Sequence, residues 1–171
     1  MSSSSTLLNQ MHHSRHHEAF NSLELQALAK LEHLPYYRGA WLRDEFLDMG
    51  RKGQIKPGGY ILNLGSTKMG NGTHWCAFVW DGNSPALYVD PYGIAPPQEI
   101  KALFPNVKYS PVQIQSYNSI LCGLYAFYML YQLLEAHLTL PQAYQGFETA
   151  AMDPKRLSHN DQLVYSFFFR Q

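Results

Sequence analysis

Four polar side chains, in the order His74, Asp90, Gln115 and Cys122 along the chain, are of the types that nucleophilic catalysis by a thiol requires. Cys122 opens a long apolar run over residues 124–131, which predicts a buried helix. A cysteine at the N-terminus of a helix faces the positive end of the helix dipole and free backbone N–H groups, which favour the reactive thiolate. We therefore predict that Cys122 is a nucleophile.

Histidine is the side chain whose ordinary pKa suits a general base at neutral pH. Of the eight histidines, four lie in the first 20 residues and three lie on or beside predicted helices. His74 instead follows a glycine-rich loop and begins a predicted strand over residues 75–80, where functional side chains are often presented. We predict that His74 takes the proton of the Cys122 thiol.

Asp90 and Gln115 have types and positions that complete such a site. Asp90 ends a predicted strand, 86–90, that should pair with 75–80 in a hairpin, so its carboxylate can approach and orient the imidazole. Gln115 can donate its amide N–H to a developing oxyanion, with the backbone N–H of Cys122 as second donor. The alternatives are a turn or cap residue at Asp90 and an ordinary polar strand residue at Gln115.

Two neighbours of these residues are predicted to contact substrate. Trp75 follows the base and could shield the Cys–His pair from water, although a plain core position is the equal alternative. Gly123 follows the nucleophile and lets a substrate backbone approach closely, because it has no side chain.

Helical and strand patterns alternate irregularly along the chain, which predicts an α+β fold with helices packed on a mixed or antiparallel sheet. Asn21 and Glu24 have the spacing of a capping box at the start of a first helix, which Pro35 ends. Ser158 or Asn160 is expected to cap the last helix. The other expected elements are strands at 60–64, 75–80, 86–90 and 106–115 and helices at 97–104 and 122–137.

Composition limits the classes of function. We expect a flexible tail over residues 1–20 and a single domain over 21–171, rich in aromatic residues with 12 Tyr, 9 Phe and 3 Trp. The net charge is zero, so there is no global attraction to nucleic acid or anionic membrane. An apolar stretch long enough to span a membrane is absent, and the serine-rich start is not a secretory signal.

The two cysteines predict reduced thiols in an intracellular protein rather than a disulfide framework. Neither a CxxC pair nor an HExxH helix occurs, so we expect no metal and no cofactor.

Two segments resemble the adenain family, the maturation proteases of adenoviruses. Residues 72–80 (GTHWCAFVW) resemble the histidine strand of the family, and residues 115–125 (QSYNSILCGLY) resemble its oxyanion-to-nucleophile segment with the same Gln-to-Cys spacing. The likeness extends over roughly residues 22–135 and includes PYYRG at 35–39. The DPYG turn at 90–93 is more similar to the adenain-type proteases of virophages and Polinton-like elements.

The resemblance implies a central mixed sheet with the nucleophile at the N-terminus of a buried helix, as in SUMO-type proteases, which share the His-Asp-Gln-Cys set. It implies a viral or virophage cysteine endopeptidase that processes capsid protein precursors during virion maturation, at sites containing glycine. A deconjugating protease for ubiquitin-like modifiers is the first alternative, and an inactive capsid-associated structural protein is the second.

The resemblance also sets expectations about partners. We expect a monomer that acts on capsid precursors in the virion and in the cytoplasmic viral factory of the host, without a membrane partner. The adenovirus enzyme has Glu where Asp90 stands, and it is activated by DNA and by a disulfide-linked peptide. Neither activator is expected here, because the net charge is zero and the one spare thiol, Cys76, lies inside the histidine strand.

Overall fold

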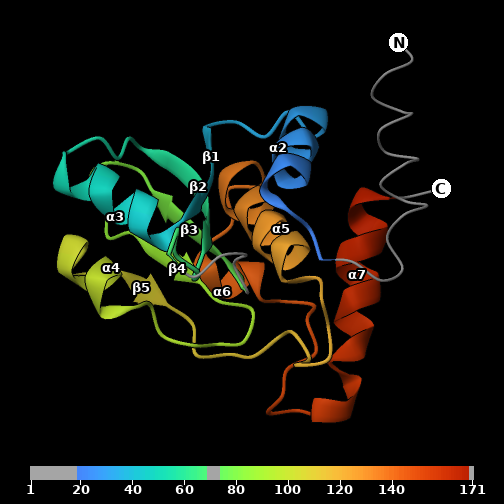
Figure 1. Ribbon diagram of the computed structural model, residues 1–171. Coiled ribbons are helices and arrows are strands. Elements are labelled where there is room, and N and C mark those ends of the chain that lie inside the picture. The colour runs from blue at the N-terminus through green and yellow to red at the C-terminus, as the bar shows by residue number, and fades with distance from the viewer. Residues whose placement is uncertain (1–18, 69–73, 170–171) are drawn as a thin grey trace.

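Five strands form one mixed sheet in the order β1-β2-β3-β4-β5 in the computed structural model, which describes residues 19–68 and 74–169 (Figure 1). Strands β2, β3 and β4 are antiparallel neighbours, whereas β1 runs parallel to β2 and β5 runs parallel to β4. The strands are β1 (Tyr37–Leu42), β2 (Gly58–Asn63), β3 (Trp75–Trp80), β4 (Leu87–Val89) and β5 (Lys108–Tyr109).

Helices cover both faces of this sheet, so the expected α+β class with a mixed sheet is confirmed (Figure 1). Helices α3 and α4 lie on one face, while α5 covers the other and carries α2 and α7 on its outer side. The helices are α2 (Ser22–Leu31), α3 (Arg43–Arg51), α4 (Gln98–Leu103), α5 (Cys122–Leu134), α6 (Leu140–Ala143) and α7 (Ser158–Phe168), with a 3-10 turn at Pro154–Arg156.

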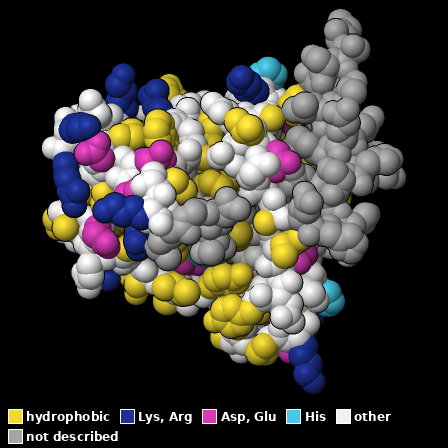
Figure 2. All heavy atoms as spheres, viewed as in Figure 1, with side chains coloured by type: hydrophobic (Ala, Val, Ile, Leu, Met, Phe, Trp, Pro, Cys, Tyr) yellow, Lys and Arg dark blue, Asp and Glu magenta, His cyan; other side chains and the backbone are white. Residues whose placement is uncertain are grey.

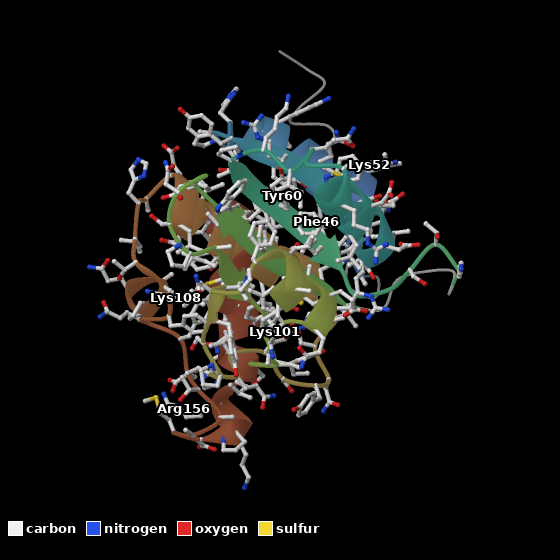
Figure 3. All side chains as sticks on the ribbon, turned by 90° about the vertical axis from the view of Figure 1, so that its left-hand side faces the viewer. Phe46, Lys52, Tyr60, Lys101, Lys108 and Arg156 are labelled. Carbon is white, nitrogen blue, oxygen red and sulfur yellow. The ribbon has the colours of Figure 1, made fainter. Side chains whose placement is uncertain are left out.

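Side chains of β3 alternate between two hydrophobic cores, as the two-residue period of a strand requires. Trp75 and Ala77 belong to the core under α5, whereas Cys76 and Phe78 belong to the core under α3 and α4. The second core includes Phe46, whose ring lies 5.3 Å from that of Tyr60, and the two meet in the interior while Lys52 points outward (Figure 3). The alternation matters for the site because His74 precedes the strand on the same side as Cys76.

Helix α5 is the buried helix that the apolar run predicted. Nine of its 13 residues are buried, and it begins at Cys122 as expected. It ends at Leu134, three residues before the expected end. The nucleophile candidate is therefore fixed to an element that is packed along most of its length.

Several local predictions are confirmed and others are wrong. The capping box forms, since the Asn21 side chain accepts from the Glu24 N–H and Glu24 accepts from the Asn21 N–H. The expected strand at 106–115 shrinks to the two residues of β5, because Pro111 cannot donate to a ladder. The last helix is preceded by Leu157 without a side-chain cap, so neither expected capping residue acts as one.

The expected tail lies mostly outside the described residues, which begin at Ala19. Phe20 is 2% exposed and belongs to the core under α5. Within the described ranges, none of the helices combines the length and the apolar character that a membrane crossing needs.

Candidate active site

The hairpin of β3 and β4 brings His74 and Asp90 together. Ala77 pairs with Val89, so one step along the same antiparallel register places Cys76 opposite Asp90, with His74 two residues further along the face. The backbone carbonyl of His74 still accepts from Leu64 N, which holds the imidazole at the end of the sheet. His74 Nε2 lies 2.8 Å from Asp90 Oδ1, and the Asp90 side chain is fully buried.

A tight turn after β4 fixes the carboxylate of Asp90. The backbone N–H of Tyr92 donates to Asp90 Oδ1 at 2.8 Å, and the N–H of Gly93 donates to the Asp90 carbonyl at 2.8 Å. Gly93 has φ +73°, and a side chain there would meet the Pro111 carbonyl oxygen at 2.7 Å. The turn thus requires glycine. Asp90 Oδ1 serves both this turn and the His74 imidazole, and the predicted role of Asp90 as orienter of a base stays a prediction.

An aromatic stack covers one face of the imidazole. The ring of Tyr92 lies parallel to that of His74 at 4.5 Å, with an angle of 11° between the planes. Tyr117 continues the stack at 5.0 Å from Tyr92, and its side chain is 71% exposed. A π-face beside the ring stabilises the imidazolium form and limits rotation of the imidazole.

Cys122 approaches the same imidazole from α5. Its thiol lies close enough to His74 to help raise the pKa of the imidazole, and the residue is 7% exposed. The preceding residue, Leu121, supplies no side-chain cap, so N–H groups of the first turn remain for an anion. The helix N-terminus therefore presents the thiol, its own backbone N–H and a positive dipole end at one point.

The surroundings of His74 favour its protonated form. Burial opposes the charge and is the largest influence, but hydrogen bonds to Asp90, then to Cys122 and Cys76, outweigh it. Together they raise the pKa of His74 well above its ordinary value of 6.5. An imidazolium next to the Cys122 thiol is the partner that a reactive thiolate needs.

Gln115 lies behind the nucleophile in a fixed position. Its backbone N–H donates to the Pro91 carbonyl at 3.0 Å, its side chain is fully buried, and Nε2 donates to the Ser119 carbonyl at 3.1 Å. The carboxamide has a second N–H in addition to the one that Ser119 accepts. The role of Gln115 as oxyanion donor stays a prediction.

Comparisons with known proteins add little to this geometry. No protein-family model and no curated protein matches the chain. Two solved structures of the ASFV pS273R protease are similar to it, one with TM-score 0.47 and 17% identity, the other, a Se-Met crystal structure, with TM-score 0.44 and 16% identity. Each match covers 83% of this chain and 67% of the other. The chemistry of the site is therefore argued from its own atoms.

Trp75 and Gly123, the two predicted substrate contacts, both pack against Phe20, and their contact with substrate stays a prediction. Trp75 is 8% exposed, and its indole N–H donates to the Phe20 carbonyl at 2.9 Å. A side chain at Gly123 would lie 3.1 Å from the Phe20 Cβ and 3.2 Å from the Trp75 ring. The close packing of α5 against Phe20 and Trp75 is therefore one reason for a glycine at position 123.

Two neighbouring residues of α7 position the segment before the nucleophile, and sequence reasoning missed this role. The buried Asn160 donates to the carbonyls of Ile114 and Glu148, at 2.7 Å each, and accepts from the Glu148 N–H at 2.9 Å. Asp161 accepts from Ser119 Oγ at 2.8 Å and from the hydroxyl of Tyr125 at 2.7 Å. The sequence offered one indication of this role: Asn160 and Asp161 are adjacent polar residues in a helix whose other side is apolar.

Cys76 is the second residue that sequence reasoning undervalued. It is fully buried, and burial raises the pKa of its thiol to about 11, so the thiol is neutral at pH 7. Its sulfur, a nitrogen of His74 and an oxygen of Asp90 all lie within 4.8 Å of one another. The predicted base and orienter thus have a thiol on each side, one at Cys122 and one at Cys76.

Proposed function

We propose that the chain is a cysteine endopeptidase that processes capsid protein precursors of a virus or virophage. One combination supports the peptidase assignment. The His74 imidazole bonds to the Asp90 carboxylate at 2.8 Å, and the Cys122 thiol, at the uncapped N-terminus of α5, helps raise the pKa of His74. This combination serves one chemistry well, acyl transfer through a thiolate.

The steps follow from the positions of these groups. The Cys122 thiol gives its proton to His74, and the sulfur attacks the carbonyl carbon of a peptide bond. The backbone N–H of Cys122 and the Gln115 carboxamide donate to the resulting oxyanion. His74 then protonates the leaving amine, and a water molecule that gives its proton to His74 cleaves the thioester to release the acid and regenerate the thiol.

The substrate assignment is supported by the sequence resemblance at residues 72–80 and 115–125, of which residues 72 and 73 lie outside the described ranges. An exposed aromatic side chain beside the base, Tyr117, gives an extended peptide a surface on which to bind. Basic and acidic side chains are interspersed on the face over α3 and α4 (Figure 2), and we propose that nucleic acid is not an obligate activator. We propose the virion and the viral factory as the places of action.

The test uses two kinds of substrate. Glycine-containing fluorogenic peptides and a co-expressed capsid precursor should be cleaved, and Cys122→Ala and His74→Ala should each reduce the rate by at least about 10³-fold. His159→Ala is the matched control, because His159 is an exposed histidine of α7, and its rate should equal that of the wild type. Undiminished cleavage by Cys122→Ala would disprove the peptidase assignment.

A deconjugating protease would use the same four residues, so substrate choice must separate the two functions. Efficient hydrolysis of ubiquitin- or SUMO-fluorophore conjugates, with the capsid precursor left intact, would establish the deconjugase instead.

A further inference from the structure

Three donor groups of different chemistry lie together on one face of the β3–β4 hairpin. His74 and Cys76 are two residues apart, so their side chains share a face, and the register places Cys76 opposite Asp90. Their donor atoms lie within 4.8 Å of one another, and all three residues are buried. Thiol, imidazole and carboxylate are the three ligand types that zinc takes in proteins.

We propose that His74, Cys76 and Asp90 form a binding site for a zinc-class divalent cation, and that its occupation switches the peptidase off. Zinc bonds of about 2.3 Å to sulfur and about 2.0–2.2 Å to nitrogen and oxygen place tetrahedral ligands roughly 3.4–3.6 Å apart. The donor atoms of the three residues lie within 4.8 Å of one another, so their separations have to change by at most roughly 1.4 Å to reach these values.

A separate observation points to a ligand at this place. Asp90 Oδ2 is buried and has no hydrogen-bond partner among the described residues, and the same holds for the hydroxyl of Tyr88. A buried carboxylate oxygen without a partner costs free energy, which a bound cation would recover. Oδ2 can ligate the cation while Oδ1 keeps its bond from the Tyr92 N–H, so the turn that holds Asp90 does not have to open.

The switch follows from the shared imidazole and rests on the proposed function. When the cation binds, the Cys76 thiol releases its proton to solvent and the thiolate ligates the metal. Nε2 of His74 also releases its proton to solvent, and its lone pair then binds the metal instead of the N–H donating to Asp90. His74 then loses its bond to Asp90, which orients it. Bound to the metal, His74 can no longer take the proton of the Cys122 thiol.

Binding is tested without any activity measurement, in a Cys122→Ala protein whose one cysteine is Cys76. Titration with Co²⁺, a spectroscopic substitute for zinc, should give a near-ultraviolet thiolate-to-cobalt charge-transfer band that saturates at one ion per chain. The other histidines of the chain can bind Co²⁺ but give no thiolate band. Tyr88→Phe in the same background is the matched control and should keep the band, because it removes a neighbouring hydroxyl and no ligand. Absence of the band in the Cys122→Ala protein at saturating Co²⁺ would overturn the proposed site.

The switch is tested in the protein with Cys122 intact. Zinc inhibition of peptide cleavage is measured for the wild type and for Cys76→Ser, each relative to its own uninhibited rate. Loss of one ligand should weaken inhibition by at least about tenfold. Equal inhibition of the two proteins would show that zinc acts at Cys122 and His74 alone, which refutes the switch. Should Cys76→Ser melt below the assay temperature, Cys76→Ala serves the same comparison. If the Cys122→Ala protein shows the cobalt band and the metal-free wild type cleaves no peptide, the proposed function is refuted and the metal site still stands.

Discussion

Replacement of Asp90 by Asn removes a charge from the site and keeps its shape. In the wild type, Asp90 Oδ1 accepts both from the Tyr92 N–H and, at the same distance of 2.8 Å, from His74 Nε2. The Tyr92 N–H should hold the carboxamide oxygen of Asn in that position, with the NH₂ group where Oδ2 was. The imidazole then keeps its tautomer and orientation, and only the charge assistance is lost.

The expected size of the effect follows from that geometry. A hydrogen bond to a charged group contributes about 1.5–3 kcal/mol, which corresponds to roughly a 10- to 150-fold loss in kcat/KM. An Asn that turned its NH₂ toward the imidazole would impose the wrong tautomer and cost about 10⁴-fold, as in serine protease triads. Because the largest influence that raises the pKa of His74 is the bond to Asp90, that pKa should also fall.

Two assays measure the outcome: peptide hydrolysis and the rate of Cys122 alkylation, both followed from pH 5 to about pH 10. In Asp90→Asn, the alkaline limb of the hydrolysis profile should move down into the measured range, because in the wild type the pKa of His74 is raised to about 12. Asp81→Asn is the matched control. Asp81 is an exposed residue of the turn that joins β3 and β4, and its side chain accepts from the N–H groups of Asn83 and Ser84. Wild-type rates and an unmoved pH limb would show that Asp90 does not orient His74. A loss near 10⁴-fold in kcat/KM would refute the argument that the Tyr92 N–H fixes the orientation of the introduced carboxamide.

Three further outcomes are expected. Asn160→Ala leaves three backbone groups without their partner and should lower the free energy of unfolding by about 3–5 kcal/mol in urea denaturation, whereas the exposed Ser166→Ala should change it by less than about 0.5 kcal/mol. A thiol reagent should modify Cys122 in the native protein and Cys76 only after denaturation, as read by peptide mass spectrometry; equal labelling would contradict their placement. Because the folded pKa of His74 is raised from 6.5 to about 12, its protonation stabilises the fold fully below pH 6.5 and progressively less as the pH rises toward 12. The difference in unfolding free energy between the wild type and His74→Ala should therefore shrink from pH 6.5 upward, and a difference that grows with pH would contradict this sign.

Local patterns predicted the parts of the fold that local forces determine. The apolar run after Cys122 predicted α5, because a helix that is buried on most sides needs apolar residues on most sides. The hairpin that carries His74 and Asp90 was predicted from two short strands and a turn between them. These two elements hold the nucleophile, base and orienter, so most of the site followed from short-range information.

The remaining features depend on contacts between distant segments. Strand β1 was missed because its residues do not alternate in burial. Helix α3 was missed although Glu45 accepts from the Leu42 N–H at its start, because Leu42 is not an ordinary capping residue. The side chain of Asn160 bonds to Ile114, 46 residues away, which no periodicity reveals. From the sequence, Cys76 looked like an ordinary core residue. Its proximity to Asp90 depends on the register between β3 and β4, which places the two residues opposite each other.

The base and orienter belong to one hairpin, whereas the nucleophile belongs to a helix that must dock on that hairpin across a hydrophobic core. A hairpin of this kind forms in microseconds from neighbouring residues, but the docking of α5 requires chain closure over tens of residues. During synthesis, His74 and Asp90 can therefore be paired while Cys122 is still an ordinary thiol with no partner. If the proposed function holds, hydrolytic competence appears only when folding is complete, which protects a nascent chain and its neighbours from premature cleavage.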